Sequence, residues 1–277
     1  MADALECETE IVPIRTGGDS RVAPLGDKSR FVKEIEEALF AGDVDLAVHS
    51  AKDVPEQLPD GLVIAGVPPA EDPCDALVGA ESLGALPAGA RVGTSSLRRR
   101  SQLLASRPDL DVAELRGNVD TRLGKLAAGD YAAIVLAFAG LLRLGRENEA
   151  ETRLDPRRFV PAPGQGMLAL EIRAGDERTA TTVERLDHGP SRARLECERA
   201  IVATLDTSCH TPVGASSELT GETLRAFAYV GLPDGSEWIT DSVERDAADP
   251  TATGRLLAER MLAAGAGDLL RRAETHL

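Results

Sequence analysis

The feature that most constrains the fold is an alternation of strand-like and helix-like segments between residues 10 and 172. Repeated β-α alternation of this kind predicts an α/β protein whose parallel sheets carry helices on both faces. Helical spacing of apolar residues predicts helices at 31–41, with Ser29 as the cap, and at 97–105 and 120–128. The segments that read as strands are 10–14, 45–49, 62–67, 90–93, 112–115, 131–137 and 166–172.

Two proline-rich segments interrupt the alternation and are candidate crossings between domains. They cover residues 68–73 and 160–164, and the strand that follows the second could return to the first domain. A chain of 277 residues fits two or three domains. The C-terminal part is predicted to contain a helix at 191–205, antiparallel strands at 224–231 and 237–245, and a helix at 253–264.

Composition excludes several classes of function. The net charge of -15 repels nucleic acid and anionic membranes, and aromatic residues, at 3%, are too few for base-stacking surfaces. The longest apolar run, of roughly 11 residues, is shorter than a membrane helix requires. Four histidines and four cysteines lack metal-ligand spacing, so we expect no metal site and reduced thiols in a cytoplasmic protein.

An anion site is predicted where the strand at 90–93 leads into a helix. Thr94, Ser95 and Ser96 lie at this junction, where free backbone N–H groups favour a bound anion. Arg98 and Arg99 follow in the first helical turn, a position that is unfavourable for cations unless an anion compensates. Arginine suits carboxylate or phosphate, although surface ion pairs with the abundant acids are the alternative interpretation. Further arginines follow the next two strands, namely Arg116 and Arg122 beside Gly117, and Arg143.

Asp53 and Cys209 are candidate catalytic residues of a different kind. Asp53 lies beside Lys52 in a loop after a strand, where a carboxylate could act as a general acid or base or stabilise a cation. A capping aspartate in a turn is the alternative. Cys209 lies in a loop of small residues that ends in Pro212 and Gly214, which suits a nucleophilic or ligand-carrying thiol. A structural cysteine is the alternative there.

Six segments in order together resemble the porphobilinogen deaminase (hydroxymethylbilane synthase) family. They reach from about residue 10 to the end of the chain. A set of ordered motifs is far more specific than any single one. The matching segments are residues 49–55, 93–99, 115–119, 139–145 and 163–166, and the loop around Cys209.

The resemblance implies a fold, a transferase activity and a cofactor. The implied fold has two lobes with mixed sheets, like those of periplasmic binding proteins, and a small C-terminal α+β domain. The implied boundaries are 1–69 with 165–187, 70–164, and 190–277. The implied reaction of heme and tetrapyrrole biosynthesis joins four porphobilinogen molecules head to tail with loss of ammonia, then hydrolyses off the linear tetrapyrrole. The implied primer is a dipyrromethane bound through a thioether to Cys209.

The resemblance also implies a role for each candidate residue in a cytoplasmic, monomeric enzyme. Asp53 would be catalytic. Substrate carboxylates would bind Arg116, Arg122, Arg143 and Gln165. The cofactor would be held by Cys209, Lys28, Ser50, Lys52, Thr94, Ser95, Ser96, Arg98, Arg99 and Gly117.

The N-terminal region departs from the family pattern. The family begins with a strand and a T-R-x-S-P-L-A-L segment, and this sequence starts at what resembles the end of the helix that follows. A misassigned start is one explanation, and an inactive, truncated deaminase is another. A second class of function also stays open, a non-catalytic two-lobed protein that binds carboxylates reversibly. The Cys209 loop and the third domain argue against that alternative.

Overall fold

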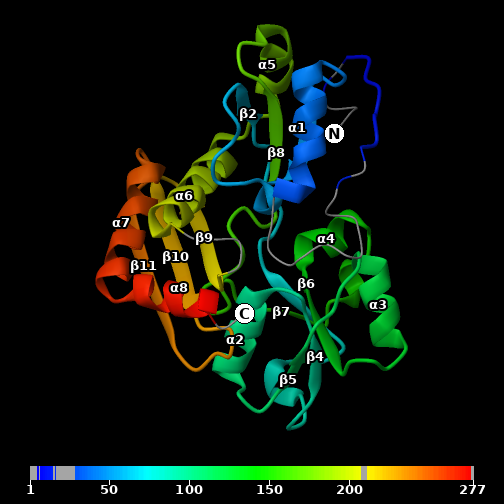
Figure 1. Ribbon diagram of the computed structural model, residues 1–277, viewed down its shortest axis with the longest axis vertical. Coiled ribbons are helices and arrows are strands. Elements are labelled where there is room, and N and C mark those ends of the chain that lie inside the picture. The colour runs from blue at the N-terminus through cyan, green and yellow to red at the C-terminus, as the bar shows by residue number, and fades with distance from the viewer. Residues whose placement is uncertain (1–4, 6, 15, 17–28, 207–210, 276–277) are drawn as a thin grey trace.

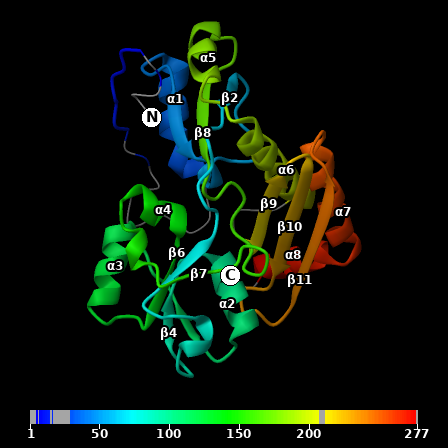
Figure 2. The same ribbon diagram turned by 180° about the vertical axis from the view of Figure 1, so that it is seen from behind.

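The computed structural model describes residues 5, 7–14, 16, 29–206 and 211–275 of the chain. Three sheets organise these residues, with strand orders β1-β8-β2, β5-β4-β6-β3-β7 and β11-β10-β9. Figure 1 and Figure 2 show two lobes, one above the other, with the third sheet and its helices to one side. The predicted class, α/β lobes followed by an α+β domain, is confirmed.

The first lobe is built on β1 (Ala47–Ser50), β2 (Leu62–Gly66) and β8 (Leu168–Arg173). Helix α1 (Ser29–Ala41) begins at the predicted cap residue, and its buried Leu39 packs with Ala47 and Leu62. Helix α5 (Glu177–Glu184) follows β8 and contacts both β2 and β8. The lobe therefore joins elements from two distant parts of the chain, as the crossing at 160–164 predicted.

Two predictions for this lobe are wrong. Residues 10–14 form no strand, and Ile11 is 81% exposed, because no described strand pairs with them. The sheet is also not parallel, since β8 is antiparallel to both β1 and β2. After the second crossing, the chain re-enters this lobe at the carboxyl end of β1, where Leu168 pairs with Ser50. Strand β8 therefore runs between its neighbours in the opposite direction.

The second lobe contains a mixed five-stranded sheet. Strand β4 is parallel to β5 and β6, and β3 is antiparallel to β6 and β7. Separate apolar clusters pack on its two faces, one around Leu103 and the other around Leu141. The elements are β3 (Asp75–Val78), β4 (Arg91–Gly93), α2 (Leu97–Ser106), β5 (Asp111–Ala113), α3 (Val119–Ala127), β6 (Ala133–Ala137), α4 (Phe138–Arg143) and β7 (Thr152–Arg153).

The C-terminal unit packs helices on an antiparallel sheet. Its elements are α6 (Gly189–Leu205), β9 (Val213–Thr220), β10 (Thr223–Gly231), β11 (Trp238–Asp246), α7 (Pro250–Ala263) and α8 (Ala266–Thr275). The predicted pairing of the strands at 224–231 and 237–245 is confirmed. Strand β9 and helix α8 were not predicted. In the described part of the chain no helix has the length and apolar character needed to cross a bilayer.

Candidate active site

The turn that carries Asp53 follows directly from β1. A short 3-10 helix, η3 (Ala51–Asp53), continues the strand, and Lys52 and Asp53 are partly buried. The segment just after the second crossing fixes this turn, since the Ala51 backbone N–H donates to the Met167 carbonyl at 3.0 Å. Gly164 has φ +73°, and a Cβ there would lie 3.0 Å from the Lys52 nitrogen. The turn that carries Asp53 is thus held at the strand end, as predicted, by a close backbone contact.

The predicted strand-to-helix junction is confirmed at the start of α2. Ser96 is the N-cap residue, and its hydroxyl accepts from the Arg99 backbone N–H at 3.4 Å. Thr94 Oγ1 accepts from the Ser96 backbone N–H at 3.1 Å, which closes the junction. Arg98 and Arg99 lie in the first turn, as expected, and are only 5% and 6% exposed.

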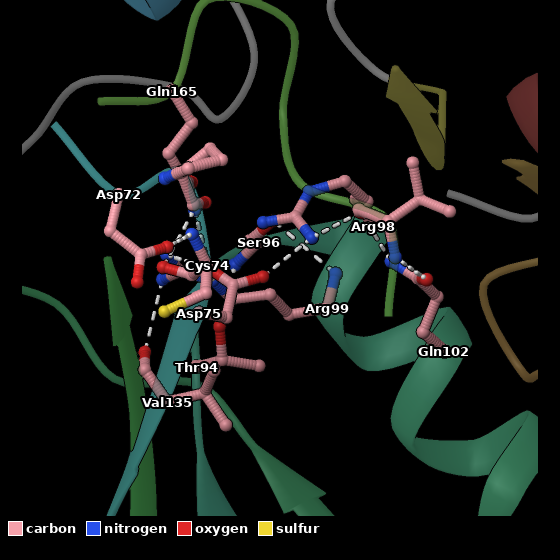
Figure 3. A network of polar contacts seen from close by, with 12 residues as sticks. Asp72, Cys74, Asp75, Thr94, Ser96, Arg98, Arg99, Gln102, Val135 and Gln165 are labelled. Atoms are coloured by element: carbon pink, nitrogen blue, oxygen red, sulfur yellow. Dashed lines mark hydrogen bonds and ion pairs between the residues drawn. The ribbon is translucent and has the colours of Figure 1, made fainter. Parts of the chain in front are cut away.

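Asp75 supplies an anion that compensates these two arginines (Figure 3). It is the first residue of β3 and is fully buried. Its Oδ2 accepts from Arg98 Nη1 at 2.7 Å, and its Oδ1 accepts from Arg99 Nε and Nη2 at 3.0 and 2.7 Å. Burial alone would raise the pKa of Asp75, but the two guanidinium groups outweigh burial and lower that pKa to about 2. Asp75 is therefore a carboxylate at neutral pH within the site.

Gln165 joins the same network from the second crossing. Its Nε2 donates to Asp75 Oδ1 at 3.0 Å and to the Pro73 carbonyl at 2.6 Å. Arg98 Nη1 also donates to the Val160 carbonyl at 2.8 Å. Gln102 binds both backbone groups of the same residue, since it accepts from the Val160 N–H and donates to the Val160 carbonyl. The start of α2, the start of β3 and the crossing are thus tied together by buried hydrogen bonds.

The other predicted arginines lie in different settings. Arg122 Nε donates to the Gly117 carbonyl at 2.7 Å, and its Nη2 lies 3.5 Å from Ser95 Oγ. Burial, and then the charge of Arg99, lowers the pKa of Arg122 to about 10. Arg143 Nη2 donates to the Gly166 carbonyl at 2.8 Å, while Arg116 is exposed and donates to Glu114 Oε1 at 2.7 Å. Arg122 therefore lies near Ser95 and Arg99 at the start of α2, whereas Arg116 forms an ion pair with Glu114 at the surface.

Lys52 connects the Asp53 turn electrostatically to the arginine network. Burial lowers the pKa of Lys52, and the negative charge of Asp53 opposes that effect. The charges of Arg99 and Arg98 lower this pKa further, whereas the charge of Asp75 raises it. Among the described residues, this region brings the guanidinium groups of Arg98, Arg99 and Arg122, together with Lys52, against the carboxylates of Asp53 and Asp75. Positive charge is in excess, and such a site favours a ligand with several carboxylates.

Two predicted cofactor residues, Lys28 and Cys209, lie outside the described residues. Ser50 ends β1, and its side chain makes no cap hydrogen bond to η3. Gly117 has φ +121° and precedes the Asn118 cap of α3. Among the described residues, no group of His, Cys, Asp or Glu has the arrangement of a metal site.

Comparison with known proteins identifies two family domains in this chain. The family description "Porphobilinogen deaminase, dipyromethane cofactor binding domain" matches residues 1–181, and "Porphobilinogen deaminase, C-terminal domain" matches residues 193–263. Porphobilinogen deaminase of Thermus thermophilus is 46% identical over 268 residues, covering 96% of this chain and 89% of that protein. The Roseiflexus castenholzii protein of the same name is 48% identical over 254 residues, covering 91% of this chain and 84% of that protein.

One of the solved structures to which the chain is similar is a periplasmic domain. The periplasmic VFT2 domain of Bordetella pertussis BvgS aligns with a TM-score of 0.35 and 17% identity, covering 56% of this chain and 66% of that one. Both family domains match in order, and the identity to curated deaminases extends over nearly the whole chain. The chain therefore belongs to the porphobilinogen deaminase family.

Proposed function

We propose that this chain is a hydroxymethylbilane synthase, which joins four porphobilinogen molecules head to tail, releases ammonia at each addition and then hydrolyses off the linear tetrapyrrole. The observation that carries the proposal is the excess of positive charge from Lys52, Arg98, Arg99 and Arg122 beside the Asp53 turn. Each pyrrole unit bears an acetate and a propionate, so a growing chain accumulates carboxylates. Fixed guanidinium groups in a partly buried site suit such a ligand.

The residues present also fit a dipyrromethane cofactor. Arg98 Nε is buried and has no hydrogen-bond partner among the described residues, so it can donate to a carboxylate. The residues that would hold the cofactor are Ser50, Lys52, Thr94, Ser95, Ser96, Arg98, Arg99 and Gly117, with Lys28, and with a thioether at Cys209. When bound, dipyrromethane supplies the terminal pyrrole carbon to which the first substrate is joined.

Asp53 is the proposed catalytic residue. Loss of ammonia from porphobilinogen leaves an electrophilic, cationic pyrrole. A carboxylate at the position of Asp53 stabilises that cation by accepting a hydrogen bond from the pyrrole N–H, and it assists proton transfer. The side chains proposed to bind substrate carboxylates are Arg116, Arg122, Arg143 and Gln165.

The proposed site residues come from three proposed domains. Residues 1–69 with 165–187 form the lobe that contributes Asp53, residues 70–164 form the arginine-rich lobe, and residues 190–277 form the domain with the cofactor cysteine. We expect a monomer in the cytoplasm, as the resemblance to the family implies, with porphobilinogen as its small-molecule partner.

Intact mass and substrate consumption test the proposal together. Purified protein incubated with porphobilinogen is expected to carry the added mass of a dipyrromethane and to consume substrate. Cys209→Ser is expected to carry no added mass. Asp53→Ala is expected to keep its fold and to lose turnover by about 10²–10⁴-fold, the range for removal of a general acid-base or electrostatic group.

The same experiment separates the alternatives. A reversible carboxylate-binding protein would show ligand-dependent melting with no change in mass, and Cys209→Ser would behave like the wild type. An inactive deaminase would leave both mass and porphobilinogen concentration unchanged. Normal turnover by Asp53→Ala would remove Asp53 from the mechanism while leaving the cofactor assignment intact.

A further inference from the structure

We propose that Asp75 is a positioning residue that gives Arg98 and Arg99 different tasks: it occupies Arg99 and orients Arg98 toward a ligand carboxylate. The inference rests on the proposed function. Asp75 is fully buried at the start of β3, and each of its two oxygens binds one arginine. The two arginines are adjacent in sequence and almost equally buried, but their donor groups are used differently.

Arg99 is committed to the protein itself, so it would contribute to cofactor binding through its charge and not through a free nitrogen. Its Nε and Nη2 both donate to Asp75 Oδ1, which takes up the edge of the guanidinium that best matches a carboxylate. Its third nitrogen, Nη1, donates to the Val135 carbonyl in β6 at 3.0 Å. All three nitrogens of Arg99 therefore have partners, and the side chain links β3, β6 and α2.

Among the described residues, hydrogen bonds hold Arg98 by one nitrogen only. Its Nη1 donates to Asp75 Oδ2 and to the Val160 carbonyl, at 2.7 and 2.8 Å. Its Nε is buried without a partner among the described residues, which is unfavourable for a charged donor. The Nε–Nη2 edge of Arg98 is therefore the one left for a ligand carboxylate. The same edge of Arg99 binds Asp75.

The surroundings of Asp75 fix this asymmetry. Gln165 Nε2 donates to Oδ1, the same oxygen that binds Arg99, and so holds the carboxylate in one orientation. A single carboxylate between two guanidinium groups leaves one positive charge, and Lys52 and Arg122 add to it. Asp75 thus makes two neighbouring cations tolerable without removing the attraction for an anionic ligand.

Arginine Nε–H signals in the full-length protein test the proposal directly. Isotope labelling of arginine, with assignments from Arg98→Lys and Arg99→Lys, resolves the two groups by NMR. Without ligand, the Arg99 Nε–H is expected to exchange slowly with solvent, because it is bonded to Asp75. When the cofactor-free protein assembles its dipyrromethane from added porphobilinogen, the Arg98 signal is expected to shift and the Arg99 signal to stay in place.

Variants of the carboxylate extend the test. Asp75→Asn is expected to abolish slow exchange at Arg99. It is also expected to raise by about tenfold the porphobilinogen concentration at which the Arg98 signal is half shifted, as loss of one charge-assisted contact would. The matched control is Asp109→Asn, which breaks a side-on pair with Arg107 at the exposed end of α2 and is expected to change neither signal.

Two results would overturn the inference. One is an Arg99 signal in the wild type that shifts with porphobilinogen as much as that of Arg98, and the other is unchanged exchange at Arg99 in Asp75→Asn. If Asp75→Asn does not fold, the porphobilinogen-induced shifts of the Arg98 and Arg99 signals in the wild type still test the inference. If the wild type consumes no porphobilinogen, the proposed function fails, whereas exchange at Arg99 in the unliganded protein still reports on Asp75.

Discussion

At the residue scale, Asp75 explains why two arginines can stand in the first turn of α2. Cations at this end of a helix meet the positive end of the helix dipole, which disfavours them. Asp75 places its negative charge within 2.7 Å of both guanidinium groups, and Ser96 caps the helix. The helix start therefore tolerates both positive charges before any ligand binds.

The depressed pKa of Asp75 predicts a pH dependence of stability. Its value of about 2 lies below the ordinary 3.8, so ionised Asp75 stabilises the folded state above pH ~4, and this contribution is lost as the pH falls toward 2. The size of the effect is about 2 kcal/mol, because one pKa unit corresponds to ~1.4 kcal/mol. Denaturant unfolding should show the wild type converging on Asp75→Asn as the pH falls from 5 to 2.

The contrast with Asp109 checks this prediction. The pKa of Asp109 is also lowered to about 2, mainly by its hydrogen bond with Arg107, but this pair is exposed to solvent. Solvent screening makes such pairs weak, so Asp109→Asn should follow the wild-type curve closely. A constant gap between wild type and Asp75→Asn across this pH range would contradict the assignment.

At the element scale, helix α6 fastens the C-terminal unit to the second crossing. Glu198 is buried, and its Oε2 accepts from the Gly164 backbone N–H at 2.8 Å while its Oε1 accepts from the Ser217 hydroxyl at 2.8 Å. Burial raises the pKa of Glu198, and the charge of Arg194 and these hydrogen bonds oppose that rise. One carboxyl group on α6 thus joins β9 to the segment that also contacts the Asp53 turn.

Removing this carboxyl should destabilise the protein. Glu198→Ala leaves the buried Gly164 N–H and the Ser217 hydroxyl without their acceptor, at a cost of about 1–3 kcal/mol for each unsatisfied group. Equilibrium unfolding in denaturant measures the loss. Glu196→Ala, two residues earlier on the exposed face of α6, is the matched control and should stay within about 0.5 kcal/mol of the wild type. Equal effects of the two variants would rule out the proposed link.

How far these elements could be predicted depended on how local their signals are. The α1 and α2 starts follow from capping residues and apolar spacing within a few positions, and the strand before Asp53 follows from its own composition. Asp75 could not be found this way, because its partners Arg98 and Arg99 are 23 and 24 positions away. The direction of β8 was also hidden, since it depends on how the second crossing turns the chain.

At the scale of the whole molecule, the second crossing is where the three structural units meet. A Cβ on Gly164 would lie 3.0 Å from the Lys52 nitrogen of the first lobe, and Val160 exchanges two hydrogen bonds with Gln102 of the second. The Pro161 carbonyl accepts from the Ala215 N–H of β9 at 2.9 Å. A change in this segment should therefore reach the Asp53 turn even though the segment contains no proposed catalytic residue.

Gly164→Ala tests this connection. Gly164 has positive φ, and a Cβ would lie 3.0 Å from both the Ala51 carbonyl carbon and the Lys52 nitrogen, so the turn must shift. We expect destabilisation of about 1–3 kcal/mol and, under conditions where the variant is fully folded, a fall in porphobilinogen turnover.

Gly145→Ala provides the control for backbone strain alone. Gly145 also has positive φ, +65°, but a Cβ there meets no atom within 4 Å. We expect a loss of about 1 kcal/mol and normal turnover per folded molecule. Thermal unfolding and initial rates measured side by side distinguish the two variants, and equal turnover in both would show that the Gly164 contact does not position Asp53.

The local excess of positive charge has a kinetic consequence in a chain with a net charge of -15. A dicarboxylate approaching from afar meets a repulsive field, and only within about one Debye length, ~8 Å at physiological ionic strength, can the arginines outweigh it. Added salt screens the distant repulsion before it weakens the buried, short-range attraction. Moderate ionic strength should therefore speed the encounter, the reverse of the usual behaviour of a cationic protein that captures an anion.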